Sequence, residues 1–314
     1  MESLVIIAGP TAVGKSALSV ELAKRIGGEI VSADSMQVYR GMDIGTAKIT
    51  SEEMQGIQHY LIDICEPDED FNVFLFQKYA SQAVSEINKK GKIPILAGGT
   101  GFYIQALLYG IDFNSSNGEN PEYRERLEER IFNGELDAVY EELRSVDPKT
   151  CEIIHKNNTK RVIRALEFFH ETGKPISLHN EEEHQKKPIY NSCFFVLNDE
   201  RETVYDKINR RVDLMVENGL VEEVKGLKNK GYSTDNISML GLGYKEVLQY
   251  LDGEITLERA IELIKQGSRH YAKKQITWFK REREVIWLNR PEFNQDNSLI
   301  LNKMISEMKN KGII

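Results

Sequence analysis

Near its N-terminus the chain reads Gly9-Pro10-Thr11-Ala12-Val13-Gly14-Lys15-Ser16, which matches the phosphate-binding loop pattern G-x-x-x-x-G-K-[ST]. The apolar run Leu4–Ala8 precedes this loop, and Leu18, Leu22 and Ile26 follow it at helical spacing. A strand, a glycine-rich loop and a helix in this order surround a phosphate with backbone N–H groups and a helix N-terminus. We therefore expect a phosphorylated ligand here, rather than a turn without one. Lys15 would add a positive charge, and the Ser16 hydroxyl would hold Mg²⁺.

The composition is that of an ordinary soluble globular protein. Of 314 residues, 40% are hydrophobic and 29% charged, enough for one large domain with an insertion or for two domains. The chain has no apolar run of membrane-spanning length and begins directly with a strand, so we expect a cytoplasmic protein without a membrane partner. Cys65, Cys151 and Cys193 are widely spaced, which argues against a disulfide framework and a zinc site.

The charge balance bears on nucleic acid as a partner. A net charge of −8 speaks, taken alone, against such a partner. Net charge is an average over the surface, however, and residues 269–274 and 280–283 carry a local excess of basic side chains. The net charge therefore argues against a nucleic-acid partner but does not exclude one.

Further apolar runs predict an α/β fold with a parallel sheet. They lie at Glu29–Ala33, His59–Ile64, Ile93–Ala97, Phe194–Leu197 and Val285–Leu288, mostly separated by helical patterns. Between residues 114 and 198 this alternation stops, and charged helical stretches take its place. We predict a discontinuous P-loop core of residues 1–113 and 199–314, with a mostly helical insertion domain at 114–198.

Two polar segments follow predicted strands, where the ligand crevice of a parallel sheet lies. Asp34 comes directly after the second strand, and it is either a catalytic carboxylate or a cap for the next turn. Gly98-Gly99-Thr100-Gly101 follows Ile93–Ala97, and Thr100 either presents its hydroxyl to the crevice or caps a helix. The segment Val38–Lys48 has no clear period and predicts a long ordered loop of the kind that carries function.

The chemistry of the loop is open at this point. Most P-loops bind ATP or GTP, which favours an NTPase or a small-molecule kinase. Such enzymes normally have an apolar strand that ends in Asp, whereas Ile93–Ala97 is followed by Gly-Gly-Thr. An alternative is that the loop holds a diphosphate as the leaving group while carbon is transferred, which requires an activated nucleophile and a cationic clamp.

Several motifs together resemble those of the bacterial tRNA dimethylallyltransferase (tRNA isopentenyltransferase) family. Beside the P-loop, they are Asp34–Lys48, Gly98–Gly101, Arg161–Glu167, Gly243–Glu246 and Ala272–Phe279. The resemblance runs from about residue 4 to about residue 288, and its Asp34–Lys48 block is highly specific. The chain departs from the family at Ser16, where Thr is frequent, and at Leu240-Gly241-Leu242, where some relatives carry Arg.

The resemblance implies transfer of a dimethylallyl group from dimethylallyl diphosphate to the N6 amine of the adenine 3′ of a tRNA anticodon. It implies a P-loop NTPase/kinase-like core, with the insertion gripping the anticodon stem-loop. Asp34 would be the base, and Thr100 would position the amine. Lys15, Ser16 (through Mg²⁺) and Arg211 would neutralise the diphosphate, with Arg210 as the neighbouring candidate. The residues that bind the diphosphate would be Gly9, Pro10, Thr11, Ala12, Val13, Gly14, Lys15 and Ser16.

The resemblance also implies contacts to tRNA. The adenine must be flipped out of the anticodon loop to reach Asp34, past Ser35, Met36 and Gln37. Arg124, Lys160, Arg161 and Arg164 would meet the phosphate backbone; the alternative for these four is a solvated helix face. We expect the protein to act as a monomer.

Two other functions compete with this one. A kinase that moves the γ-phosphate of ATP to a small molecule or nucleotide explains the P-loop and Asp34, but it leaves the Asp34–Lys48 block unexplained. A non-catalytic RNA-binding protein with a nucleotide switch predicts that loss of Asp34 is harmless.

Overall fold

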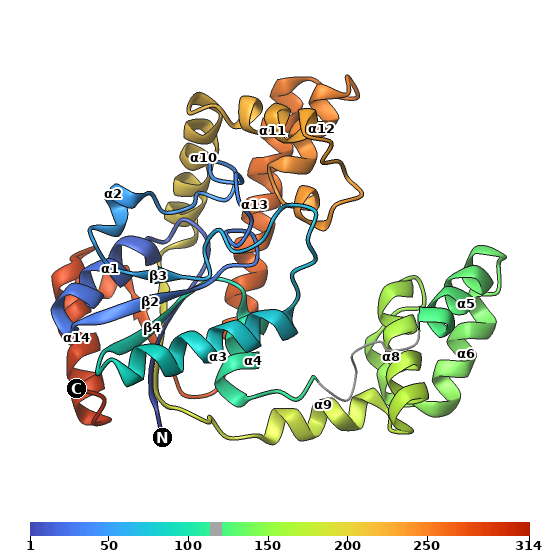
Figure 1. Ribbon diagram of the computed structural model, residues 1–314, viewed down its shortest axis with the longest axis horizontal. Coiled ribbons are helices and arrows are strands. Elements are labelled where there is room, and N and C mark those ends of the chain that lie inside the picture. Colours follow the sequence, from blue (N-terminus) through green and yellow to red (C-terminus); the bar gives the residue numbers. More distant parts are fainter. Residues whose placement is uncertain (114–120) are drawn as a thin grey trace. The chain divides into compact units, whose positions relative to one another are not determined.

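The fold is described from a computed structural model, which covers residues 1–113 and 121–314 (Figure 1). The chain divides into two compact units. The first is formed by residues 1–108 and 189–314, and the second by residues 109–188.

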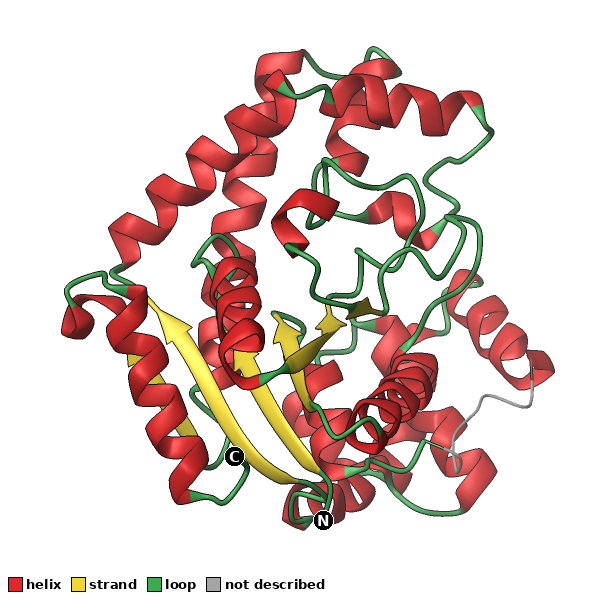
Figure 2. Cartoon of the chain, turned by 60° about the vertical axis from the view of Figure 1, so that its left-hand side comes forward, coloured by secondary structure: helices red, strands yellow, loops and turns green. Residues whose placement is uncertain are grey.

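The first unit is built on a six-stranded sheet in which every neighbouring pair of strands is parallel (Figure 2). The order across the sheet is β3-β2-β4-β1-β5-β6. This confirms the α/β fold and five of the predicted strands. The strands are β1 (Ser3–Ala8), β2 (Gly28–Ala33), β3 (His59–Tyr60), β4 (Ile93–Gly98), β5 (Asn191–Asn198) and β6 (Val285–Asn289).

Strand β3 is shorter than the run His59–Ile64 predicted. It ends at Tyr60 because the next residues leave the extended conformation: Leu61 has φ 63° and Asp63 has φ 54°. Asp63 then accepts a hydrogen bond from Lys48 Nζ at 2.5 Å. The segment after Tyr60 therefore supports the long loop that precedes it, and does not extend the sheet.

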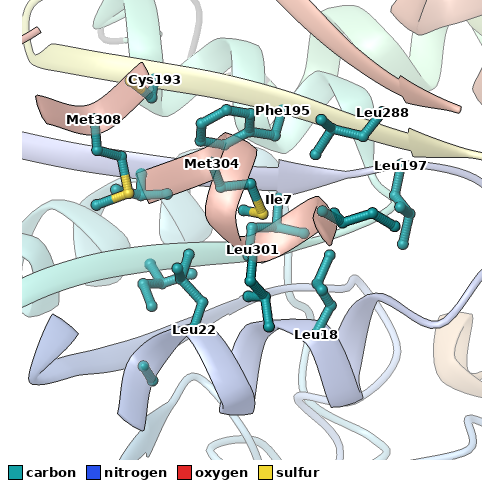
Figure 3. Packing of buried hydrophobic residues seen from close by; sticks show 14 of the residues in the cluster. Ile7, Leu18, Leu22, Cys193, Phe195, Leu197, Leu288, Leu301, Met304 and Met308 are labelled. Atoms are coloured by element: carbon teal, nitrogen blue, oxygen red, sulfur yellow. The ribbon is translucent and has the colours of Figure 1, made fainter. Parts of the chain in front are cut away.

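One face of the sheet is covered by α1 (Lys15–Ile26) and α14 (Asn297–Asn310). Figure 3 shows Leu301 and Met304 of α14 between the side chains of Phe195 and Leu197 and those of α1. All of these side chains are essentially inaccessible to solvent. Helix α14, which lies beyond the last predicted strand, thus contributes to the same core as the P-loop helix.

The opposite face meets helices from the middle and the end of the chain. Phe194 of β5 packs edge-on against Phe279, with ring centroids 6.2 Å apart, while Cys193 and Phe195 face the α14 side. Phe76 stacks on Tyr103 with centroids 4.3 Å apart. The elements concerned are α3 (Val73–Lys89), α4 (Gly101–Tyr109) and α13 (Leu257–Phe279).

The remaining helices of this unit lie beyond the carboxyl edge of the sheet. The long helix α10 (Arg201–Glu217) packs along α13, and α11 (Leu220–Asn229) and α12 (Tyr244–Leu251) pack next to them (Figure 1). Three short helices complete the unit: α2 (Ser51–Met54), η2 (Ile237–Leu240) and η3 (Arg290–Phe293).

The second unit is helical in its described residues. It has its own core, which includes Leu127, Val139, Leu143 and Val162. Its helices are α5 (Pro121–Phe132), α6 (Leu136–Val146), α7 (Pro148–Ile153), α8 (Thr159–Thr172) and α9 (Ile176–Gln185).

The predicted boundaries of this insertion need correction. The prediction ended it at Asn198, but residues 191–198 form β5, which pairs with β1 and β6. The unit therefore ends at Pro188, because the buried run around Phe195 belongs to the sheet. The predicted start, Asn114, lies outside the described residues, and the unit begins at Tyr109. Within the described ranges, no helix combines the length and apolarity needed to cross a membrane.

Asp147 connects two helices of the second unit. Its Oδ1 accepts the Thr150 N–H at 3.0 Å, and its Oδ2 accepts the Thr150 hydroxyl at 2.7 Å and the Ser177 N–H at 2.9 Å. The residue is 1% exposed. Burial raises the pKa of Asp147, but the hydrogen bonds from Ser177 and Thr150 outweigh it and leave the pKa below its ordinary value.

We predict that Asp147→Asn lowers the free energy of unfolding by about 1–3 kcal/mol at pH 7, because an amide N–H₂ replaces an acceptor that faces two donors. A depressed pKa stabilises the fold above the ordinary pKa of Asp, and this stabilisation is lost as pH falls through the folded value. The difference between Asp147→Asn and the wild type should therefore narrow below about pH 4. Urea unfolding followed by far-UV circular dichroism would measure it.

Asp137→Asn is the matched control, since Asp137 lies on α6 and its side chain is 80% exposed. It should change stability by less than about 0.5 kcal/mol. An equal effect of the two substitutions at every pH would contradict the role given to Asp147.

Candidate functional site

The P-loop has the conformation that its sequence predicts. Gly9 has φ 145°, and a Cβ there would lie 2.2 Å from the Leu197 carbonyl oxygen of β5. Gly14 has φ 95° and is the N-cap of α1. The loop thus joins β1 to α1 in backbone conformations that favour glycine, with the first N–H groups of α1 at its end.

Lys15 lies back over the loop. Its Nζ donates to the Pro10 carbonyl at 2.8 Å. Burial and the positive charge of Arg211 lower the pKa of Lys15 to about 8, against the opposing effect of Asp34. A bound anion would relieve this electrostatic cost. Ser16, in contrast, is exposed at the start of α1.

Arg290 stabilises the conformation of the P-loop, and the sequence analysis did not predict this role. Its Nε donates to the Val13 carbonyl at 2.9 Å, and its Nη1 donates to Asn297 Oδ1 at 3.0 Å. The residue is 8% exposed, and burial lowers its pKa. Arg290 therefore connects the P-loop to the η3–α14 region, which is distant in sequence.

Two cavities meet beside the loop and share Thr11, Asp34, Arg211 and Tyr271. The larger, about 420 Å³, contains the P-loop side chains and is called the P-loop cavity. Besides the shared residues, its lining includes Lys15, Ser16, Gln37, Gly98, Gly99, Gln275, Ile30, Ile49, Ile62, Ala47 and Ala97. The smaller, about 280 Å³, is called the outer cavity; its lining includes Ser35, Met36, Ile208, Val212, Met215, Leu242, Tyr244, Ile264 and Ser268.

Asp34 combines the two roles that its sequence position left open. Its Oδ1 accepts the Met36 N–H at 2.9 Å, which is a local turn cap. The residue is only partly buried, and it also lines both cavities. The cap fixes the position of a carboxylate that remains accessible from either cavity.

Arg211, and not Arg210, reaches the site. Arg211 is partly buried on α10, and its Nη1 donates to Thr11 Oγ1 at 3.4 Å. Burial lowers the pKa of Arg211, and the nearby Asp34 opposes that shift. Arg210 is exposed. Because arginine keeps its charge, the site holds a fixed cation next to the P-loop.

Thr100 does not line either cavity, but it is connected to both through Tyr271. The Thr100 N–H donates to the Ala33 carbonyl at 3.2 Å, and its carbonyl accepts from the first turn of α4. The side chain of Tyr271 hydrogen-bonds with those of Thr100 and Gln275, and burial raises the pKa of Tyr271. Sequence reasoning did not assign a role to Tyr271 or Gln275.

The loop from Asp34 to Lys48 is held by one carboxylate. Glu223 of α11 accepts the N–H groups of Asp43 at 2.9 Å, Ile44 at 2.7 Å and Gly45 at 3.1 Å. It also accepts the Tyr244 hydroxyl at 2.7 Å, and a Cβ on Gly45 would lie 2.6 Å from the Tyr244 ring. The loop is therefore ordered, as the sequence predicts, although it contains little regular structure.

Gln37 is engaged within this loop. Its Nε2 donates to the carbonyls of Thr46 at 3.4 Å and Ala47 at 3.3 Å, and its Oε1 accepts from Ser32 Oγ at 3.4 Å. Ser35 and Met36 line the outer cavity. The three residues after Asp34 thus divide between the two cavities.

In the second unit, the four predicted tRNA contacts differ in their surroundings. Arg124 forms a bidentate pair with Glu167, with both N–O distances 2.7 Å, and Glu167 is 2% exposed. This pair joins α5 to α8, while 45% of the Arg124 side chain stays accessible. Lys160 and Arg161 are exposed in the first turn of α8, and Arg164 is partly buried on the same helix.

The described residues contain no group of three or more His, Cys, Asp or Glu side chains that could hold a metal. The P-loop cavity does present oxygen ligands, namely the Ser16 hydroxyl and the carboxylates of Asp34 and Glu53. Mg²⁺ is often held by one or two protein oxygens together with substrate phosphates and water. This donor set fits Mg²⁺ bound together with a phosphorylated ligand.

Comparison with known proteins identifies relatives over the whole chain. The IPP transferase family model matches residues 37–282. A tRNA dimethylallyltransferase from Lachnoclostridium phytofermentans is 54% identical over 314 residues, which cover 100% of both chains.

Solved structures are also similar to this chain over almost its whole length. The tRNA isopentenylpyrophosphate transferase of Bacillus halodurans is 44% identical, with a TM-score of 0.74 over 99% of this chain and 98% of that one. A eukaryotic dimethylallyltransferase acting on tRNA is 29% identical, with a TM-score of 0.85 over 100% of this chain and 80% of that one.

We predict that the affinity for inorganic diphosphate falls as pH rises above 8, where free Lys15 loses its proton. Only the protonated ammonium attracts the anion, so binding above this pH must take up a proton and the affinity falls up to about tenfold per pH unit. Lys15→Arg, which keeps its charge at these pH values, is the control. Calorimetric titrations of both proteins with diphosphate from pH 7 to pH 9 would measure the two affinities. The ionisation of diphosphate itself affects both proteins equally, so it cancels in the ratio of their affinities. A ratio that stays constant with pH would contradict the prediction.

Proposed function

The chain belongs to the IPP transferase family and acts as a tRNA dimethylallyltransferase, and we propose in detail how its two cavities perform that reaction. The proposed donor is dimethylallyl diphosphate, and the proposed acceptor is the N6 amine of the adenine 3′ of the anticodon. The observation that carries the proposal is that the P-loop cavity and the mostly apolar outer cavity both include Asp34 in their lining.

The donor binds in the P-loop cavity. Its diphosphate contacts the P-loop, Gly9 to Ser16, mainly through N–H groups at the start of α1, together with the side chains of Lys15 and Arg211. The dimethylallyl group lies against Ile30, Ile49 and Ile62, which line the same cavity. In this arrangement the carbon that reacts would lie next to the four residues common to both cavities.

The acceptor adenine enters the outer cavity after it is flipped out of the anticodon loop. Ser35 and Met36 line its path. The N6 nitrogen forms a bond to C1 of the donor while the bond from C1 to the diphosphate oxygen breaks. Asp34 accepts the proton that leaves the amine. Thr100, connected to this point through Tyr271, positions the amine.

The departing diphosphate gains negative charge as the C–O bond breaks. Lys15 and Arg211 stabilise this charge, in a partly buried setting where such interactions are stronger than in water. Ser16 would hold Mg²⁺, and Glu53 is a second oxygen donor in the lining of the same cavity. The metal, when bound, would neutralise diphosphate oxygens as a Lewis acid.

We further propose that the helical unit grips the anticodon stem-loop through Lys160 and Arg161, with Arg124 and Arg164 beside them. Phosphate contacts of this kind orient an RNA without reading its sequence. The protein would act as a monomer in the cytoplasm, where tRNA is available.

The kinase alternative loses support on two grounds. The outer cavity next to Asp34 is lined mainly by apolar side chains such as Val212 and Met215, and the otherwise polar P-loop cavity contains the apolar side chains of Ile30, Ile49 and Ile62. In addition, the full-length relative at 54% identity is named for dimethylallyl transfer to tRNA.

We predict that Asp34→Asn reduces the rate of prenyl transfer by about 10²–10⁴-fold, because the amine loses its proton acceptor. The affinity for inorganic diphosphate should not fall, since removal of a negative charge favours anion binding. The measurement is transfer of label from dimethylallyl diphosphate to unmodified tRNA in the presence of Mg²⁺. Asp206→Asn, an exposed change on α10, is the control. Full activity in Asp34→Asn would rule out Asp34 as the base.

A second prediction concerns the helical unit. Lys160→Ala and Arg161→Ala should each weaken tRNA binding and lower the slope of log affinity against log salt by about 1, because one phosphate contact is lost. Filter binding at several KCl concentrations would measure both quantities. Lys149→Ala removes another exposed cation of this unit, one paired with Glu181. If all three variants share the wild-type slope, α8 does not contact the RNA backbone.

A further inference from the structure

One face of α13 runs along the whole site. Ile264, Ser268, Tyr271, Gln275 and Trp278 follow one another at spacings of four and three, so they lie on one side of the helix. The first three line the outer cavity, and Tyr271 and Gln275 line the P-loop cavity. A Cβ on Gly101 would lie 2.3 Å from the Trp278 ring, so Trp278 covers the end of the Gly98–Gly101 loop.

Gln275 on this face connects the two loops of the site. Its Oε1 accepts the N–H of Thr11 in the P-loop at 2.9 Å, and its Nε2 donates to the carbonyl of Gly99 at 3.0 Å. The residue is 6% exposed. Because a backbone N–H can only donate and a carbonyl can only accept, the orientation of the amide is fixed.

The contact between Gln275 and Gly99 is so close that it leaves no space for a side chain at residue 99. A Cβ on Gly99 would lie 2.2 Å from Gln275 Nε2 and 3.4 Å from the Gly9 carbonyl oxygen. Thr11 Oγ1 in turn accepts from Arg211, and Thr100 follows Gly99 directly in the chain. Gln275 thus connects the loop that contacts Arg211, on the diphosphate side, to the loop that carries Thr100, on the acceptor side.

The pairing of β1 with β4 does not by itself fix these two loops relative to each other. The paired residues of β1 and β4 end at Ala8 and Gly98, and both loops begin beyond that point. Gln275 makes its two hydrogen bonds just past the end of the ladder, where backbone pairing between the strands has stopped. It therefore acts on the loops rather than on the core.

We propose that Gln275 is a positioning residue, which holds the P-loop and the Gly99–Thr100 loop at the separation that the transfer step requires. This rests on the proposed function, in which one loop binds the diphosphate and the other positions the acceptor amine. A displacement needs the nitrogen, the carbon and the leaving oxygen in line, and a misplacement of about 1 Å can cost about 10²-fold in rate.

Two substitutions of similar length separate this role from a purely structural one. Gln275→Met removes both hydrogen bonds. Gln275→Glu keeps the acceptor for Thr11, but its ionised second oxygen faces the Gly99 carbonyl and repels it. When protonated, the same carboxyl donates to Gly99 and restores both bonds. Burial raises the pKa of such a carboxyl, so protonation should fall within the range where the enzyme can be assayed.

The test is single-turnover transfer of labelled dimethylallyl from its diphosphate to tRNA, from pH 6 to pH 9, relative to wild type at each pH. Both variants should lose about 10- to 100-fold in rate at pH 8, with the KM for the donor little changed. Gln275→Glu should recover toward pH 6, and Gln275→Met should not. Gln266→Glu, an exposed change on the same helix, should match wild type throughout.

Circular dichroism at the assay temperature establishes that each variant is fully folded. Wild-type rates in both variants, or the same pH dependence in Gln275→Glu and Gln275→Met, would overturn the proposal. Hydrogen exchange at the Thr11 amide gives a readout that does not depend on activity, and it should be faster in Gln275→Met. If the wild type transfers no label, the proposed function is wrong. If hydrogen exchange at the Thr11 amide is as slow in Gln275→Met as in the wild type, the role of Gln275 is wrong, whatever the outcome for the proposed function.

Discussion

The site depends on the parallel pairing of β1, β2 and β4. In this register Ala8 and Ala33 are both partners of Gly98, so three strands end at the same level of the sheet. Gly9, Asp34 and Gly99 are the next residues along each strand. Parallel pairing alone therefore brings the phosphate loop, the carboxylate and the Gly-Gly-Thr loop to one edge, where α/β proteins bind their ligands.

Charge then determines what this edge can bind. Arg211 lies close enough to Lys15 to lower its pKa, and Asp34 is an anionic neighbour of both. Two cations in a partly buried setting favour an anionic ligand, since a bound anion relieves both the desolvation and the repulsion. A departing diphosphate is such a ligand, and its charge grows as the reaction proceeds.

Loops with little regular structure need other supports to hold catalytic groups in place. Glu223 and Lys48 fix the Asp34–Lys48 loop, Arg290 fixes the P-loop, and Gln275 joins the P-loop to the Gly99 carbonyl. Each of these side chains hydrogen-bonds at least one backbone group of the loop that it supports, and Glu223, Lys48 and Arg290 also bond other side chains. Such networks give the rigidity that helices and strands supply elsewhere.

Features that depend on near neighbours along the chain could be predicted from the sequence alone. The sequence identified the P-loop, the parallel α/β fold, the loop after Asp34 and the Gly-Gly-Thr turn, because each is encoded within one strand–loop–helix segment. The family motifs added Asp34, Thr100 and Arg211 as candidates. The three-dimensional fold was needed to show that Arg211 rather than Arg210 faces the site, that Arg124 pairs with Glu167, and that β5 belongs to the core. It also revealed Gln275 and Arg290, whose partners Thr11 and Val13 are 264 and 277 residues away in sequence. Contacts over such separations follow from the path of the whole chain, and no local pattern of residue types records them.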